Sequence, residues 1–175
     1  MRSKARFLGH PVHPMLIVFP LGLLATAVIF DIIAMLRGAA YLFSASYYMI
    51  VAGIIGGLIS AVFGAIDWLA IPRATRASRI GLWHGIGNVI VVLLFIFSWY
   101  SRRVSPDNPP EAALAFSFIG ILIALVTGWL GGELVGRLGV GVDPDANLDA
   151  RASYTTGIRL GRGAAPGEAS RPGPR

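Results

Sequence analysis

Three histidines lie beside or within the long apolar segments of this 175-residue chain. His10 and His13 come just before the first apolar segment, and His84 stands four residues before Asn88 near the start of the third. A spacing of four residues places two side chains on one face of a helix. A neutral imidazole held by a polar neighbour is a good metal ligand or proton carrier. We therefore expect His13, His84 and Asn88 to bind a cofactor.

Carboxylates at similar depth could add oxygen ligands for a divalent metal. Asp67 continues the stripe of small residues on the second apolar segment, so it should point toward the other segments. Nitrogen and oxygen ligands together suit divalent metals. The candidate set for such a metal is His10, His13, Asp67, His84 and Glu133.

Each of these groups also has a structural interpretation. His84 and Asp67 could simply lock two helices together through a hydrogen bond. Glu133 could pair with Arg137 one turn later. Asp31 could cap backbone freed by a local helix distortion, or it could serve with Asp67 as a proton-relay group.

The composition excludes several classes of protein. Apolar residues make up 55% of the chain and charged residues 14%, against roughly 25% charged in soluble domains. The net charge is +6, but the basic residues lie between apolar runs, which argues against a nucleic-acid partner. The absence of cysteine excludes thiol catalysis, disulfides and thiolate metal sites.

Four apolar stretches are long enough to cross a bilayer as helices. They cover residues 15–36, 44–71, 80–100 and 113–135. Short connections between them predict an all-α integral membrane protein with an antiparallel up-down four-helix bundle over residues 1–142. Residues 143–175 are rich in Gly, Pro, Ala and Arg, which predicts a disordered tail.

The distribution of Lys and Arg predicts the orientation. They concentrate in the N-terminal arm, in the second connection and after the fourth segment, whereas the other side has only Arg37, Arg102 and Arg103. By the positive-inside rule we expect both termini to be cytoplasmic.

Small residues recur on one face of the second, third and fourth segments. They allow close helix packing within one chain, or between copies in a homo-oligomer. Each odd segment also opens with a histidine, and each even segment closes with a carboxylate, a weak sign of a repeated two-helix unit.

The chain resembles a bacterial four-helix membrane family known as domain of unknown function 2231. The resemblance lies in residues 9–22 (GHPVHPMLIVFPLG), 65–69 (AIDWL), His84 with Asn88, and 131–142 (GGELVGRLGVGV). It implies four spans, a location in a bacterial inner membrane and no assigned activity. Some members are fused to Rieske-type iron–sulfur domains, which implies redox work in the membrane. Many members have an aromatic residue and a histidine where this chain has Gly136 and Leu138.

Three functions follow as hypotheses. The first is a redox-linked module that binds haem b or a divalent metal at the cytoplasmic end of the bundle, with a redox partner protein. The second is a small proton-linked carrier or channel subunit, and the third is a structural accessory subunit of a membrane complex. No serine–histidine–aspartate spacing, P-loop or dinucleotide fingerprint is present, so we expect no independent catalytic activity.

Overall fold

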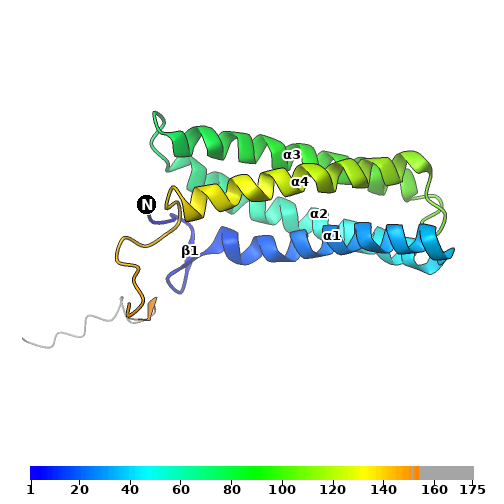
Figure 1. The fold of residues 1–175 in the computed structure, drawn as a ribbon, viewed down its shortest axis with the longest axis horizontal. Coiled ribbons are helices and arrows are strands. Elements are labelled where there is room, and N and C mark those ends of the chain that lie inside the picture. The colour runs from blue at the N-terminus through cyan, green and yellow to red at the C-terminus, as the bar shows by residue number, and fades with distance from the viewer. Residues whose placement is uncertain (151, 154–175) are drawn as a thin grey trace, which may run out of the picture.

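The computed structural model describes residues 1–150, 152 and 153, and it consists of four long helices in an elongated bundle (Figure 1). The helices are α1 (Val12–Arg37), α2 (Ala40–Leu69), α3 (Arg76–Arg102) and α4 (Glu111–Gly136). Each is long and apolar enough to cross a membrane. A short antiparallel hairpin of β1 (Arg6–Phe7) and β2 (His10–Pro11) precedes α1. The predicted all-α four-helix membrane bundle is confirmed.

The helix ends lie where local chemistry allows them, and every helix begins two to four residues before its predicted span. Pro11 is extended and stands directly before α1, so Pro14 falls in the first turn, where its missing N–H costs nothing. Gly38 ends α1 in the left-handed conformation (φ 64°) that glycine adopts without strain. The hydroxyl of Thr75 accepts from the Ser78 backbone N–H at 3.1 Å and caps α3.

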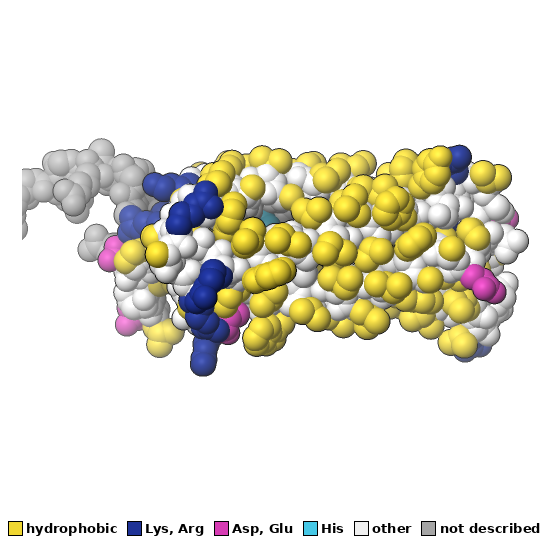
Figure 2. Space-filling view, turned by 90° about the horizontal axis from the view of Figure 1, so that it is seen from above, with side chains coloured by type: hydrophobic (Ala, Val, Ile, Leu, Met, Phe, Trp, Pro, Cys, Tyr) yellow, Lys and Arg dark blue, Asp and Glu magenta, His cyan; other side chains and the backbone are white. Residues whose placement is uncertain are grey.

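The bundle has two ends that differ in chemistry. We call the end where α1 begins and α4 ends the terminal end, and the end where α1 joins α2 and α3 joins α4 the loop end. On the face shown in Figure 2, apolar side chains cover the length of the bundle and basic side chains gather mainly at the terminal end. This pattern is typical of a protein whose sides contact lipid.

Between the two ends lies an apolar core. It consists of Leu24, Ala27, Val28, Ile50, Ile54, Val91, Phe95 and Ala124. Glycines bring the helices together around it. A Cβ built on Gly53 would lie 2.6 Å from Leu24, and one built on Gly120 would lie 2.9 Å from Phe95. These glycines therefore fix how closely α1 approaches α2 and α3 approaches α4.

The two helical hairpins, α1–α2 and α3–α4, repeat one packing scheme. Phe95 packs on Gly120 as Leu24 packs on Gly53, and His84 packs on Gly131 as His13 packs on Gly64. Equivalent residues of α1 and α3 are separated by a constant offset of 71 residues. His13 corresponds to His84, Leu24 to Phe95 and Asp31 to Arg102. The even helices share a second constant offset, which relates Gly53, Ser60 and Gly64 to Gly120, Thr127 and Gly131. The weak repeat in the sequence is thus a repeat of contacts, related by an axis along the bundle.

Candidate functional site

His13 lies at the start of α1, near the terminal end, and is held by α2. Its Nδ1 donates to the backbone carbonyl of Ser60 at 2.9 Å and lies 3.1 Å from the Ser60 hydroxyl. The ring fits against α2 because residue 64 is glycine, where an added Cβ would lie 3.0 Å from the imidazole. Since a carbonyl can only accept, the proton of a neutral His13 sits on Nδ1.

His84 is held in the same way by the second hairpin. Its Nδ1 donates to the backbone carbonyl of Thr127 at 2.8 Å. Gly131 leaves room for the ring, because a Cβ added there would lie 3.1 Å from the imidazole. Its Nε2 accepts from the side-chain amide of Asn88 at 3.1 Å. The amide oxygen of Asn88 in turn accepts from the Thr127 hydroxyl at 3.1 Å. His84 and Asn88 share one helix face, as their spacing in the sequence predicts.

The two rings meet between the hairpins. Their centroids are 6.4 Å apart and their planes are perpendicular. The repeat explains why His13 and His84 lie together. Equivalent residues of two units related by an axis face one another when they lie close to that axis. Asn88 breaks the equivalence, since the corresponding position of the first hairpin is Ile17.

Asp67 was predicted to join the histidines, but its carboxylate is bound elsewhere. Its carboxylate accepts from the Ser3 hydroxyl at 2.8 Å, from the Lys4 backbone N–H at 2.7 Å and from the Ala5 backbone N–H at 3.3 Å. The prediction overlooked the N-terminal arm, which folds back over the terminal end and supplies three donors. Asp67 therefore anchors this arm, and it is not the partner of His84.

The remaining members of the expected divalent metal set also lie apart. Glu133 pairs with Arg76 at 2.7 Å, so the predicted pairing with Arg137 is wrong. The ion pair joins α3 to α4. His10 lies on the β1–β2 hairpin, where its Nε2 is 3.0 Å from the Ser153 hydroxyl. Among residues 1–150, 152 and 153, no three His, Asp or Glu side chains form a group that could hold a metal. His13 and His84 are the pair that the fold does bring together.

Asp31 has a partner that the sequence analysis missed. Arg102 donates from both terminal nitrogens to the two carboxylate oxygens of Asp31, at 2.8 and 2.7 Å. Both side chains are fully buried near the loop end. Arg102 also donates to three serine hydroxyls at 3.0–3.1 Å, those of Ser46, Ser98 and Ser117.

This network replaces two expectations. Arg102 is not one of the surface charges of the loop end, and Asp31 accepts from a guanidinium rather than from freed backbone. A charge in a membrane interior is tolerated when it is paired and fully hydrogen-bonded. The offset shared with His13 and His84 was the signal that could have linked Asp31 to Arg102.

The terminal end is closed by the segment after α4. Arg2 pairs with Asp143 at 2.8 Å and with Asp145 at 3.0 Å, and Arg6 reaches Asp143 at 3.4 Å. The Asp145 backbone N–H, followed by the hydrogen bonds and charge of Arg2, holds the pKa of Asp143 below its ordinary value of 3.8. Of the tail predicted to be disordered, residue 151 and residues 154–175 lie outside the described part of the chain.

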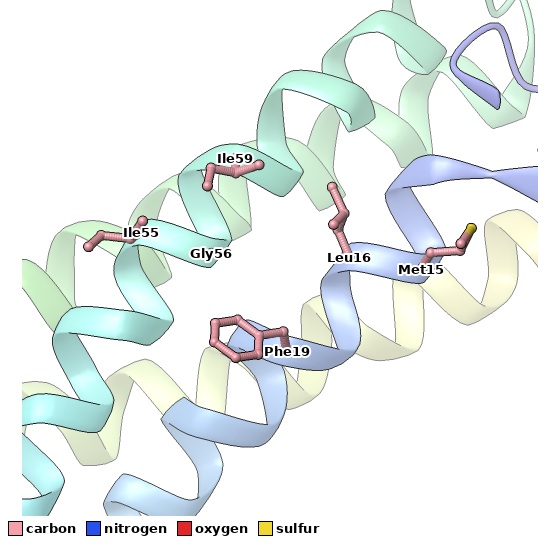
Figure 3. Close-up of a pocket in the computed structure, with 6 residues that line it drawn as sticks. All are labelled: Met15, Leu16, Phe19, Ile55, Gly56 and Ile59. Carbon is pink, nitrogen blue, oxygen red and sulfur yellow. The ribbon is translucent and has the colours of Figure 1, made fainter. Parts of the chain in front are cut away.

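A pocket of about 200 Å³ opens on the outer side of α1 and α2 (Figure 3). Its lining is apolar and consists of Met15, Leu16, Phe19, Ile55, Gly56 and Ile59. Figure 3 shows Leu16 and Phe19 reaching from α1 toward Ile55 and Ile59 of α2. None of these residues is a histidine or a carboxylate, so this pocket is separate from the paired imidazoles.

The comparison with family models agrees with this architecture. The model described as "Predicted membrane protein (DUF2231)" matches residues 9–144. The chain belongs to this family. The matched range of this DUF2231 protein contains all four helices, both paired histidines and the Asp31–Arg102 pair. No curated protein and no solved structure matches the chain.

Proposed function

We propose that this protein is a redox-linked membrane module that binds one metal, as a bare ion or as haem iron, between His13 and His84. The observation that carries the proposal is the pair of perpendicular imidazoles with centroids 6.4 Å apart, each anchored to the carbonyl of a neighbouring helix. The bundle lies in a bacterial inner membrane with both termini in the cytoplasm, so the site lies at the cytoplasmic end.

The anchoring bonds support a ligand role. Metal-binding histidines commonly donate one ring N–H to a carbonyl, which fixes the tautomer and leaves the other nitrogen as the ligand. His13 and His84 both make this bond through Nδ1, to Ser60 and Thr127. Nε2 is then the nitrogen that can bind a metal in each ring.

The chain's own residues would each have a defined task. His13 and His84 would supply the ligands, and the Asn88 amide, which donates to Nε2 of His84 at 3.1 Å, would have to turn away to free that nitrogen. Ser60 and Thr127 orient the rings, while Gly64 and Gly131 keep the space beside them. A redox-active metal held by these residues would supply electron transfer to a partner protein.

A proton-linked carrier is less well supported by the same contacts. A relay from the histidines to Asp31 would cross the apolar core of Leu24, Ile50 and Phe95, which are buried and offer no side-chain proton carrier. Asp31 itself is bound by Arg102, and Asp67 by the N-terminal arm. The structural accessory role is the outcome expected if no metal is found.

One spectrum and one elemental analysis test the proposal. We expect detergent-purified protein to contain one equivalent of metal and, if that metal is haem iron, to show a Soret band that shifts after dithionite. His13→Ala and His84→Ala should each lose the metal. His10→Ala is the matched control, because it removes a histidine that lies on the hairpin outside the bundle. Full metal content in His84→Ala, or no metal in the wild-type protein after reconstitution, would contradict the proposal.

A further inference from the structure

We infer that the group held between His13 and His84 is a single monovalent copper ion, bound linearly by two imidazole nitrogens, and not a haem. This inference rests on the proposed function and names its cofactor. Three observations carry it: the separation of the rings, the contact of Trp68 with Gly81 at the α2–α3 seam, and the binding of Asp67 and Glu133 to partners other than the histidines.

The separation of the rings fits one ion. A metal–imidazole nitrogen distance is about 2.0 Å and that nitrogen lies about 1.1 Å from the ring centre, so two rings facing one ion from opposite sides have centres about 6 Å apart. The observed centroid separation is 6.4 Å. Rotation of the rings about their anchored nitrogens, without separation of the hairpins, could therefore complete such a site.

The packing around the rings does not fit a macrocycle. A porphyrin extends beyond its iron in every direction of its plane, so it needs a slot that reaches past both histidines. On one side of the rings Trp68 of α2 packs against Gly81 of α3, where an added Cβ would lie 2.6 Å from its indole, and it donates to the Ser78 carbonyl at 3.0 Å.

The Trp68 contact closes the α2–α3 seam on the terminal side of His84. Opening it for a haem would break the Trp68 hydrogen bond and separate the indole from Gly81. A bare ion leaves this contact intact, because it needs only the Nε2 atoms of the two rings as ligands.

The charges around the rings favour a monovalent ion. Asp67 is bound to the N-terminal arm and Glu133 to Arg76, so neither carboxylate serves as an anionic ligand for an ion between the rings. The cost of placing an ion in a medium of low dielectric constant rises with the square of its charge, so a divalent ion without an anionic ligand is strongly disfavoured.

The ligand number points to the same ion. Zinc in proteins almost always takes four ligands in a tetrahedron, and two imidazoles supply only half of them. Imidazole is a good ligand for copper, and the closed d¹⁰ shell of monovalent copper accepts two ligands in a line. His13 and His84 are thus a complete ligand set for this ion and an incomplete one for zinc.

The test is a set of three titrations of the full chain in detergent, under anaerobic conditions. The first uses monovalent copper in competition with bicinchoninate, the second uses hemin, and the third uses Zn²⁺. We expect one equivalent of copper to bind, with binding lost in His13→Ala and His84→Ala and retained in His10→Ala. Hemin should give no histidine-dependent Soret band, and Zn²⁺ should bind more weakly than copper.

The outcomes separate this inference from the proposed function. A histidine-dependent haem spectrum, or histidine-dependent binding of Zn²⁺ in preference to copper, would overturn the inference and leave the paired-histidine metal site standing. Binding of none of the three would overturn both. If an alanine variant fails to fold, His84→Gln serves in its place, because glutamine keeps a polar side chain of similar length at that position.

Discussion

Arg102 and Asp31 form a bidentate ion pair, at 2.8 and 2.7 Å, between two residues that are fully buried near the loop end of the bundle. They occupy equivalent positions of the two repeated hairpins, as His13 and His84 do near the terminal end. Two pairs of equivalent residues therefore join the hairpins, one ionic and one imidazole. The ionic pair fixes the hairpins to one another near the loop end, and the imidazole centroids lie 6.4 Å apart near the terminal end.

Removing one partner of the ionic pair should destabilise the bundle strongly. Asp31→Asn leaves Arg102 buried with an uncompensated charge, so we expect a loss of about 3–5 kcal/mol in the free energy of unfolding. Thermal unfolding in detergent, followed by circular dichroism, measures the effect. The double variant Asp31→Leu with Arg102→Leu should recover much of the loss, because no unpaired charge remains. An Asp31→Asn variant as stable as the wild type would show that the pair is not formed.

The glycines beside the rings should be sensitive to a single methyl group. Gly64→Ala and Gly131→Ala place a Cβ within 3.0–3.1 Å of His13 and His84. We expect each to lower stability by about 1–3 kcal/mol and to weaken metal binding, because the rings must shift. Gly85→Ala and Gly132→Ala are the controls, since a Cβ there has nothing within 4 Å. Equal effects at all four positions would show that helix packing in general, rather than the rings, explains the result.

Asn88 should restrain metal binding, since its amide occupies Nε2 of His84. Ile17 stands at the corresponding position of the first hairpin, so Asn88→Ile makes the two histidines alike. Groups that contact a ligand histidine alter metal affinity by roughly 10–100-fold, and here we expect affinity to rise. Nitrogen-15 chemical shifts of the imidazoles in metal-free protein should show Nε2 of His84 released from its hydrogen bond. Unchanged shifts together with unchanged affinity would contradict the role given to Asn88.

The closure of the terminal end should depend on pH through Asp143. Its pKa is lowered in the folded protein, so its contribution is fully present above the ordinary value of 3.8 and is lost as the pH falls through the lowered value. We expect amide hydrogen exchange in residues 1–8 to increase over that acidic range, because protonated Asp143 releases Arg2 and Arg6. Asp143→Asn should show the fast exchange at neutral pH as well. The control is Asp149→Asn, and exchange that speeds up equally in both variants would remove Asp143 as the cause.

Most of the fold follows from the sequence by simple length and polarity. An apolar segment of about 20 residues in a bilayer must satisfy its backbone internally, so the four helices could be predicted without any tertiary information. Their ends were less predictable. The helix that begins at Val12 starts before Pro14 because Pro11 already fixes an extended residue at the right place.

The candidate site could be predicted only in part. His84 and Asn88 are neighbours on one helix, so their spacing alone brings them together. The contact between His13 and His84 could be predicted only from the two-hairpin repeat. That repeat is clear in the helix contacts but weak in the amino-acid sequence. Asp67 was misplaced because the helical stripe predicts the direction of its side chain but not the folded-back N-terminal arm that binds it.

The most direct measurement of the central claim is X-ray absorption at the edge of the bound metal in the full-length protein. The account predicts two imidazole nitrogens at about 2.0 Å or slightly less and no carboxylate oxygen. It also predicts the same spectrum in His10→Ala and a changed one in His13→Ala and His84→Ala. A metal with oxygen ligands only, or a spectrum that stays the same when both His13 and His84 are replaced, would contradict it.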